Sequence, residues 1–404
     1  MTDRFRLPAE QITINDETLR DGEQTAGVVF LKQDKVKIAQ VLADTLPGAI
    51  LNAGYPPISE AEWEAVQAVA RATEGAQIEC AGRCTRADFE LCYTAVQDAH
   101  APRVSFWFPA STLMLDARFG ISATEMLDRA LDVLKFGQDL SQGNCGLDVA
   151  IADASRADMG FLVEACGRLH EAGADMLVIC DTVGRMLPHE VTPFVSELVT
   201  AVPEAGLLFH GHHDLGNGTA NALLALQAGA RGVATAVNGL GERAGMPPTE
   251  EVIANLLIRP EAFPGRVVHA DSTKLLPLSQ LVAEIANIYP HDNKPIVGAS
   301  VLRRETGTQV DWMQREVSTF QIVSPEFLGA DGIELVIGKM SSHGSLRLAL
   351  EKQGILVNDR ELSYIFQAIK VLTGRQRHIG SQDIHQIVHE ARTHVAQSKS
   401  TPIS

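Results

Sequence analysis

Two short stretches of the sequence concentrate side chains that could do chemistry. Residues 15–24 read NDETLRDGEQ and carry five ionisable groups, and residues 209–214 read FHGHHD. Residues i and i+2 of a strand project to the same side, so His210 and His212 are expected to point together while His213 points away. Two imidazoles and one carboxylate form a familiar facial set for Zn²⁺, Mn²⁺ or Fe²⁺, with positions left open for water and substrate.

Taken singly, neither stretch is specific. Any one Asp of the first stretch is better explained as a helix cap in a solvated turn, and a lone HxH pair is more often a coincidence than a ligand pair. An HxH pair that faces an Asp of the first stretch is much stronger evidence for a metal site. Whether the two stretches meet depends on the elements that carry them.

Eight apolar or β-branched runs are expected to be strands. They are residues 12–15, 49–53, 77–81, 103–108, 146–152, 175–180, 206–210 and 232–238. Segments with helical apolar spacing lie between them, such as residues 33–46, 60–73, 157–172 and 217–228. Eight strand and helix pairs predict an α/β fold, a (β/α)8 TIM barrel whose chemistry lies where the strands end. In a closed ring strand eight alone separates strand seven from strand one, so the two stretches are expected to meet.

The alternation breaks after the eighth strand. Residues 289–346 form an irregular stretch with Pro, Gly and paired basic residues, and residues 360–373 and 382–396 again predict helices. We therefore expect a TIM-barrel catalytic domain over residues 1–275. Residues 276–404 are expected to form an appended, mainly helical subdomain.

Composition excludes several classes of protein. The 404 residues are 45% hydrophobic and 21% charged, which suits a globular protein with a large core. A formal charge of −16 opposes binding to nucleic acid or to an anionic membrane. No segment approaches the roughly 20 apolar residues of a membrane helix, and the first residues lack the apolar run of a signal peptide. We expect a soluble cytoplasmic protein with reduced thiols.

Three segments resemble the signatures of the homocitrate synthase and 2-isopropylmalate synthase family, within the DRE-TIM metallolyase superfamily. They are residues 16–24 (DETLRDGEQ), 210–216 (HGHHDLG) with 220–221 (AN), and 238–245 (NGLGERAG). The resemblance implies condensation of an acyl-CoA, acetyl-CoA in the family, with a 2-oxo acid to give a 2-hydroxy-2-carboxymethyl acid. Because the chain stops where the longer isopropylmalate synthases add a regulatory domain, the homocitrate-synthase-like branch is favoured. A homodimer is also implied.

The resemblance implies a role for each matching residue. Asp21, His210 and His212 would hold a divalent ion (Zn²⁺, Mn²⁺, Mg²⁺ or Co²⁺) that polarises the keto group of the 2-oxo acid. Arg20 would stabilise the alkoxide that forms, because its guanidinium is always charged and offers forked donors.

Two further residues would complete the site. Thr182, in the segment DTVG at the tip of strand six, would donate a hydrogen bond to the carboxylate of the substrate. Gln24 would support the metal ligands.

Several family positions carry other residues here. Met246 stands at the fourth metal ligand, an Asn in the family, and Ala152 stands at a carboxylate on strand five. Asn52 replaces an acidic residue on strand two, and Arg304 replaces a His of the C-terminal subdomain. The lost carboxylate on strand five and the lost His help to activate the acetyl methyl group in the family. Arginine cannot act as this base, because it does not titrate near the working pH.

The altered positions shift the expected pocket toward positive potential. We therefore expect a 2-oxo acid with a second anionic group, bound in the pocket that contains Asn52 and clamped by Arg304 or Arg83. Equally, Arg304 could be a surface residue of a loop. Candidate replacements for the base are Glu305, Tyr289 and His291, between which the sequence does not choose.

Two other functions remain open at this point. The first is a metal-dependent aldolase or lyase that acts on a 2-oxo acid without coenzyme A, which the loss of the enolisation pair favours. The second is a catalytically silent binding protein, which would still bind metal and oxo acid.

Overall fold

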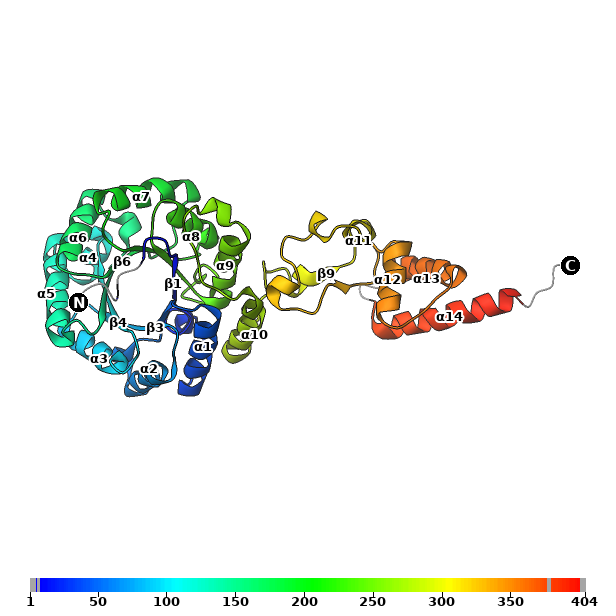
Figure 1. The fold of residues 1–404 in the computed structure, drawn as a ribbon, viewed down its shortest axis with the longest axis horizontal. Helices are drawn as coiled ribbons and strands as arrows, with labels where there is room; N and C mark the ends of the chain where they lie inside the picture. Colours follow the sequence, from blue (N-terminus) through cyan, green and yellow to red (C-terminus); the bar gives the residue numbers. More distant parts are fainter. Residues whose placement is uncertain (1–4, 6–7, 376–378, 400–404) are drawn as a thin grey trace. The chain divides into compact units, whose positions relative to one another are not determined.

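Eight parallel strands close into a barrel in chain order, with β1 beside β8 (Figure 1). The computed structural model describes residues 5, 8–375 and 379–399. The strands are β1 Thr13–Asp16, β2 Ile50–Asn52, β3 Gln77–Arg83, β4 Pro102–Pro109, β5 Gly146–Ala152, β6 Met176–Asp181, β7 Leu207–Gly211 and β8 Gly232–Thr235. Each predicted strand overlaps an observed one, so the predicted fold class is confirmed.

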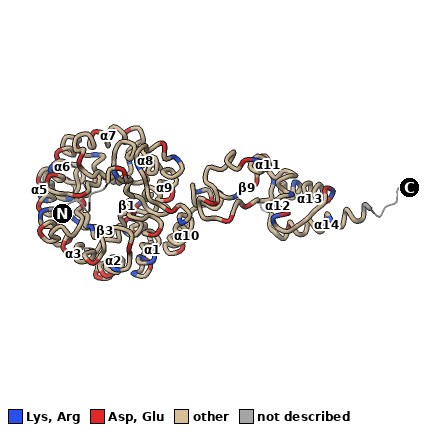
Figure 2. Tube along the Cα trace, viewed as in Figure 1, with Lys and Arg blue, Asp and Glu red and all other residues tan. Residues whose placement is uncertain are grey.

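Helices cover the outside of the barrel. They are α1 Lys32–Thr45, α2 Glu60–Ala72, α3 Arg86–Val96, α5 Ala123–Ser141, α6 Met159–Glu171, α7 Pro188–Ala201, α8 Gly218–Gln227, α9 Thr249–Ile258 and α10 Leu275–Ala286. Their starts follow from capping residues: the hydroxyl of Ser59 accepts a hydrogen bond at the start of α2, and that of Thr85 does so at α3. Figure 2 shows acidic and basic residues interspersed around this outer layer. The short helix α4 Thr112–Arg118 follows β4 and contributes residues to the cavity described below.

The chain divides into two compact units between Pro290 and His291. The sequence places this boundary earlier, at residue 275, and so assigns α10 to the second unit. In the structure α10 packs against α1 and belongs to the barrel unit. The buried face of α10, which includes Leu278 and Val282, explains this packing.

The second unit has its own small core. A two-stranded parallel pair joins β9 (Arg303–Arg304) to β10 (Glu334–Leu335). Its helices are α11 Gly307–Met313, α12 His343–Lys352, α13 Asp359–Leu372 and α14 Ser381–Lys399. Buried apolar residues of α12, α13 and α14 pack together.

In the residues described, no helix is both long and apolar enough to cross a membrane.

The inside of the barrel is apolar on one side and polar on the other. A buried apolar cluster includes Met176, Val178 and Cys180 of β6 with Leu208, Ala234, Ala236 and Met246. Buried polar residues of β1 to β5 include Asn15, Asn52, Glu79, Arg103 and Asp148. Polar groups this deep are stable only when they pair. The guanidinium of Arg103 accordingly donates two hydrogen bonds, of 2.6 and 2.5 Å, to the carboxylate of Asp148.

Candidate active site

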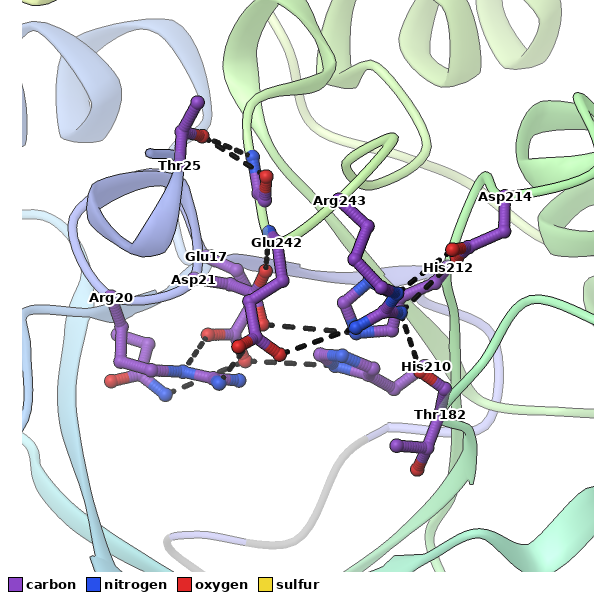
Figure 3. A network of polar contacts seen from close by, with 12 residues as sticks. Glu17, Arg20, Asp21, Thr25, Thr182, His210, His212, Asp214, Glu242 and Arg243 are labelled. Carbon is purple, nitrogen blue, oxygen red and sulfur yellow. Dashed lines mark hydrogen bonds and ion pairs between the residues drawn. The ribbon is translucent and has the colours of Figure 1, made fainter. Parts of the chain in front are cut away.

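Asp21, His210 and His212 lie together at the carboxyl ends of the strands (Figure 3). Asp21 follows β1, His210 is in β7, and His212 comes directly after β7. One potential ligand atom from each of the three side chains lies within 4.8 Å of the others. Since β8 alone separates β7 from β1, residues almost 190 positions apart in the sequence meet here.

The three side chains have the protonation states that a divalent ion requires. Burial lowers the pKa of His210 well below its usual value and also lowers that of His212, so both imidazoles are neutral. Burial raises the pKa of Asp21, but the charge of the adjacent Arg20 guanidinium, helped by the backbone N–H of Glu242, holds it below its usual value, so the carboxyl is ionised. Two neutral imidazoles and one carboxylate therefore face one another.

The ring nitrogens of His212, which lack hydrogen-bond partners among the described residues, are also consistent with a metal at this position. His212 Nε2 lies 3.8 Å from Asp21 Oδ2, which is beyond hydrogen-bond length. The buried Nδ1 of His212 has no hydrogen-bond partner among the described residues. Ligand atoms bound to an ion at roughly 2.0–2.2 Å lie about 3 to 4 Å apart, so small side-chain movements would complete the set.

Arg20 lies beside the metal-ligand cluster. Its Nε donates a hydrogen bond of 2.7 Å to Glu17, and its Nη1 donates one of 3.0 Å to Asp21. These two carboxylates fix the guanidinium while the side chain still lines the cavity described below. Its remaining N–H groups could donate to an anionic oxygen in that cavity.

Lysine 35 of α1 holds the loop that carries Arg20. The buried Lys35 Nζ donates hydrogen bonds to the carbonyls of Leu19 and Ala53, at 3.1 and 3.2 Å. It also forms ion pairs with Glu23 and Glu62, at 2.7 and 2.6 Å. One ammonium group therefore connects α1 with the loops after β1 and β2 and with α2.

The loop after β8 supports Asp21 from the other side. The backbone N–H of Glu242 donates a hydrogen bond of 3.0 Å to Asp21 Oδ1 (Figure 3). At Gly241 (φ 152°) a Cβ atom would stand 2.7 Å from the same oxygen, so this close approach requires glycine. In the same loop Arg243, which follows Glu242, forms an ion pair with Asp214 at 2.8 Å and donates a hydrogen bond of 2.7 Å to the carbonyl of Thr182.

A cavity of about 520 Å³ opens next to the ligand cluster. Four of the five predicted contact residues in the barrel line it: Arg20, Gln24, Asn52 and Thr182. Other lining residues are Asn15, Glu17, Tyr55, Glu79, Ala81, Ser105, Trp107, Pro109, Met114, Ala117, Arg118, Phe119, Ala150, Ala152, Val178, Cys180 and Glu242. Thr182 Oγ1 accepts a hydrogen bond of 2.8 Å from the N–H of Asp153, so its own proton remains available to donate.

Of the other two predicted substrate contacts, Arg83 is not among the residues that line this cavity, and Arg304 belongs to the second unit. Arg83, at the end of β3, binds Asp88 with both ends of its guanidinium, at 2.7 and 3.0 Å. The guanidinium of Arg304 donates to the carbonyl of Val301 at 3.0 Å and to the side chain of Gln321. Each of these arginines already has acceptors close to it in the chain.

Two altered family positions have clear surroundings. Met246 is fully buried and packs in the apolar cluster with Cys180 and Ala236. Its thioether is therefore part of the hydrophobic interior. Ala152 lines the cavity and leaves strand five without an ionisable group there.

Sequence reasoning assigned no role to several residues of the site. Glu17, Asp214, Glu242 and Arg243 lie inside the recognised segments, so their position was the available signal. Glu79 lies in a run read only as an apolar strand, where a lone carboxyl among buried residues was the overlooked signal. Burial, with contributions from neighbouring carboxyls, raises the pKa of both Glu17 and Glu79.

Comparison with known proteins agrees with this architecture. The HMGL-like family model matches residues 11–282, and a model described as homocitrate synthase post-HMGL domain-like matches residues 296–397. The 2-isopropylmalate synthases of Neisseria gonorrhoeae and Neisseria meningitidis serogroup A are 32% identical over 95% of this chain, which spans 64% and 74% of their lengths. That of Pyrococcus furiosus is 32% identical over 95% of this chain and 76% of its own.

Solved structures show the same fold. An HMG-CoA lyase from Bacillus subtilis superimposes with a TM-score of 0.58 at 19% identity, over 71% of this chain and 98% of the other. The matched model, the relatives and the barrel lead to one conclusion: the chain belongs to the HMGL-like family and is a relative of the 2-isopropylmalate synthases.

Proposed function

We propose that this chain is a metal-dependent acyltransferase that condenses an acyl-CoA, acetyl-CoA first among them, with a 2-oxo acid. The observation that carries the proposal is the convergence of Asp21, His210 and His212 beside Arg20 at one cavity. The name of the relatives, 2-isopropylmalate synthase, supports a synthase of this class. The comparisons name both homocitrate and isopropylmalate enzymes, so the acceptor is argued from the cavity itself.

Different residues of the cavity are proposed to bind the metal, the developing oxyanion and the carboxylate of the substrate. Asp21, His210 and His212 would hold a divalent ion, Zn²⁺, Mn²⁺, Mg²⁺ or Co²⁺, which supplies Lewis-acid polarisation of a keto group. Arg20 directs charged N–H donors at the oxygen that gains negative charge during attack. The hydroxyl of Thr182 donates a hydrogen bond to the carboxylate of the 2-oxo acid, which orients the keto carbon.

Removal of a proton from the acyl methyl group needs a base with a suitable pKa. Ala152 offers none, whereas the lining contains the carboxyl groups of Glu17, Glu79 and Glu242. The absence of an ionisable group at Ala152 is the observation that favours the alternative function. An aldolase or lyase acting on a 2-oxo acid without coenzyme A would not deprotonate an acetyl methyl group.

The second anionic group expected from the sequence remains a prediction, which the panel of 2-oxo acids below tests. Its two candidate clamps, Arg83 and Arg304, bind acceptors elsewhere in the chain. The cavity itself is lined by more carboxyl groups than guanidinium groups. The homodimer remains a prediction from the resemblance, and the mass of the protein in solution tests it.

One assay distinguishes the two functions. Release of free thiol is measured with acetyl-CoA and a panel of 2-oxo acids, after EDTA treatment and again after adding each candidate metal. Metal-dependent thiol release with one acceptor supports the condensation. Carbon–carbon bond cleavage or formation without thiol release supports the aldolase, and full activity in EDTA contradicts both.

A further inference from the structure

The inner part of the cavity carries oxygen atoms that lack hydrogen-bond donors. Asn15 Oδ1, Asn52 Oδ1 and Glu79 Oε1 are all buried, and none has a hydrogen-bond partner among the residues that the structure describes. Each of the three residues is no more than 2% exposed, and all three line the cavity. They come from adjacent strands β1, β2 and β3, and Asn52 is the register partner of Glu79.

The orientation of the two amides follows from their other contacts. The Nδ2 of Asn15 donates to Glu79 Oε2 at 3.1 Å, and the Nδ2 of Asn52 donates to Glu17 Oε1 at 3.4 Å. Because each NH₂ group faces a carboxyl oxygen, the amide oxygen is left without a partner in both residues. The group therefore offers acceptors to a ligand and few donors.

The opposite wall of the cavity has a different character. Ala150 and Ala152 of β5 and Val178 and Cys180 of β6 line it with small or apolar side chains. A ligand that fits both walls has apolar carbon atoms on one side and hydrogen-bond donors on the other. A branched hydrocarbon side chain would leave the amide oxygens of Asn15 and Asn52 unpaired, and that costs free energy.

The unpaired oxygens are close to the ligand cluster. Glu17 Oε1 lies 3.9 Å from His210 Nδ1 and also accepts the hydrogen bond from Asn52. The side chain of a short acid bound at His210 can therefore reach Asn52. Burial and the neighbouring carboxyl groups of Asp148 and Glu17 raise the pKa of Glu79 well above its usual value, so Glu79 is protonated and the acceptors that remain are the amide oxygens of Asn15 and Asn52.

We propose that the acceptor is a short 2-oxo acid whose side chain carries a hydrogen-bond donor, a hydroxyl or an ammonium group, received by the amide oxygens of Asn15 and Asn52. This inference rests on the proposed function for the presence of a 2-oxo acid. It adds the chemistry of the side chain, which the family resemblance leaves open.

Matched pairs of oxo acids test the proposal on the full-length, metal-loaded protein. In one pair a hydroxyl replaces a methyl group: 4-hydroxy-2-oxobutanoate against 2-oxopentanoate. A shorter pair is 3-hydroxypyruvate against 2-oxobutanoate. With acetyl-CoA present, we expect kcat/KM to be about 10- to 100-fold higher for the donor-bearing member of at least one pair. 4-Amino-2-oxobutanoate then distinguishes an ammonium from a hydroxyl, and oxaloacetate serves as the anionic comparison.

A second measurement does not depend on turnover. The rise in Tm caused by each oxo acid is recorded with Mn²⁺ and without acetyl-CoA. If no acid turns over but the donor-bearing acids still stabilise the protein more, the condensation is wrong and the side-chain inference stands. Equal or better use of the alkyl acids, with turnover intact, overturns the inference and keeps the condensation. No turnover and no stabilisation by any donor-bearing acid overturns the inference as well.

Two variants test whether Asn15 and Asn52 are responsible for the preference for hydroxyl-bearing oxo acids. Asn52→Leu and Asn15→Leu keep the branched shape of the side chain but remove both the amide oxygen and the NH₂ group, so each is expected to reduce the hydroxyl preference by about 10-fold. Thr73→Val is the matched control, because the hydroxyl of Thr73 is also buried without a partner among the described residues but lies outside the cavity. A preference that survives both Leu variants in folded protein contradicts the assignment.

Discussion

The arginine beside the ligand cluster is held in one geometry by two carboxylates. Arg20→Lys keeps the positive charge, but a single ammonium cannot contact Glu17, Asp21 and a developing oxyanion together. We expect kcat to fall by about 100- to 1,000-fold, the usual cost of one oxyanion donor. The affinity for Mn²⁺, measured by calorimetry, is expected to remain within about 3-fold, a difference of less than 1 kcal/mol. A variant with nearly normal kcat shows that the guanidinium is not needed.

The adjacent residues His212 and His213, directly after β7, provide an internal control for metal binding. His212→Ala removes a proposed ligand, and we expect Mn²⁺ affinity to fall by at least about 100-fold. His213 points away from the cluster, and its Nδ1 accepts a hydrogen bond of 3.0 Å from the N–H of Gly218. His213→Ala should therefore keep metal binding. Equal losses in the two variants would contradict the assignment of ligands.

Asp16 makes stability depend on pH near neutrality. Burial raises its pKa to about 6, although Thr18 and Thr249 donate hydrogen bonds to its carboxyl oxygens. Because the folded-state pKa is above the unfolded value, its contribution to stability is full below about pH 4 and is lost as the pH rises through 6. The shift corresponds to about 2 to 3 kcal/mol.

Asp16→Asn tests this effect, since it keeps one acceptor and removes the titration. The free energy of unfolding of the variant, relative to wild type, is expected to increase by about 2 kcal/mol between pH 4.5 and pH 7.5. Chemical denaturation at both pH values measures it. A constant difference across this range shows that Asp16 does not titrate there.

At the scale of elements, the eight strands could be predicted from repeated patterns, and the meeting of Asp21 with His210 and His212 could be predicted from the closed barrel. The alternation of apolar runs with helical spacing is repeated eight times, so local errors do not alter the fold class. Asp21 and the HxH pair could be brought together because a closed ring makes strands seven and one near neighbours. The contact between Glu79 and Asn15 could not be predicted, because a strand pattern shows which face a residue occupies but not what its side chain pairs with.

Helix α1 contributes a buried ammonium that positions the loop with Arg20. Lys35→Met would leave the carboxylates of Glu23 and Glu62 and two carbonyls without that donor. We expect a loss of about 3 kcal/mol in the free energy of unfolding, because removing one member of a buried ion pair leaves the charge of the other member buried and unpaired. The matched control on the same helix is Lys32→Met, which removes an exposed pair with Glu64 and should cost less than about 1 kcal/mol. Similar costs for the two variants contradict this role.

For the whole molecule, the number of units could be predicted but not their boundary. The end of the strand and helix alternation indicated an appended part. Whether α10 belonged to it depended on tertiary packing against α1, which periodicity alone does not reveal. The irregular residues after Pro290 were hardest to interpret, because Arg304 binds nearby carbonyls and an amide that no motif connects with it.

The division of the chain leads to a last prediction. Every member of the ligand cluster, and Arg20, lies in the unit that ends at Pro290. The second unit buries its own apolar cluster, which includes Leu346, Ile365 and Ala391, and none of that cluster comes from the barrel. A chain of residues 1–290 is therefore expected to fold, with a cooperative thermal transition and Mn²⁺ affinity within about 3-fold of the full chain, a difference of less than 1 kcal/mol.

Activity of the same shortened chain then reports on the second unit. If metal binding persists while thiol release is lost, the second unit supplies a group that the chemistry needs, and the search for the base moves to residues such as Glu305. If thiol release persists as well, the base lies among the barrel residues, where Glu17, Glu79 and Glu242 are the carboxyl candidates in the cavity. An unfolded product contradicts the independence of the barrel, because the cores of the two units would then depend on each other for stability.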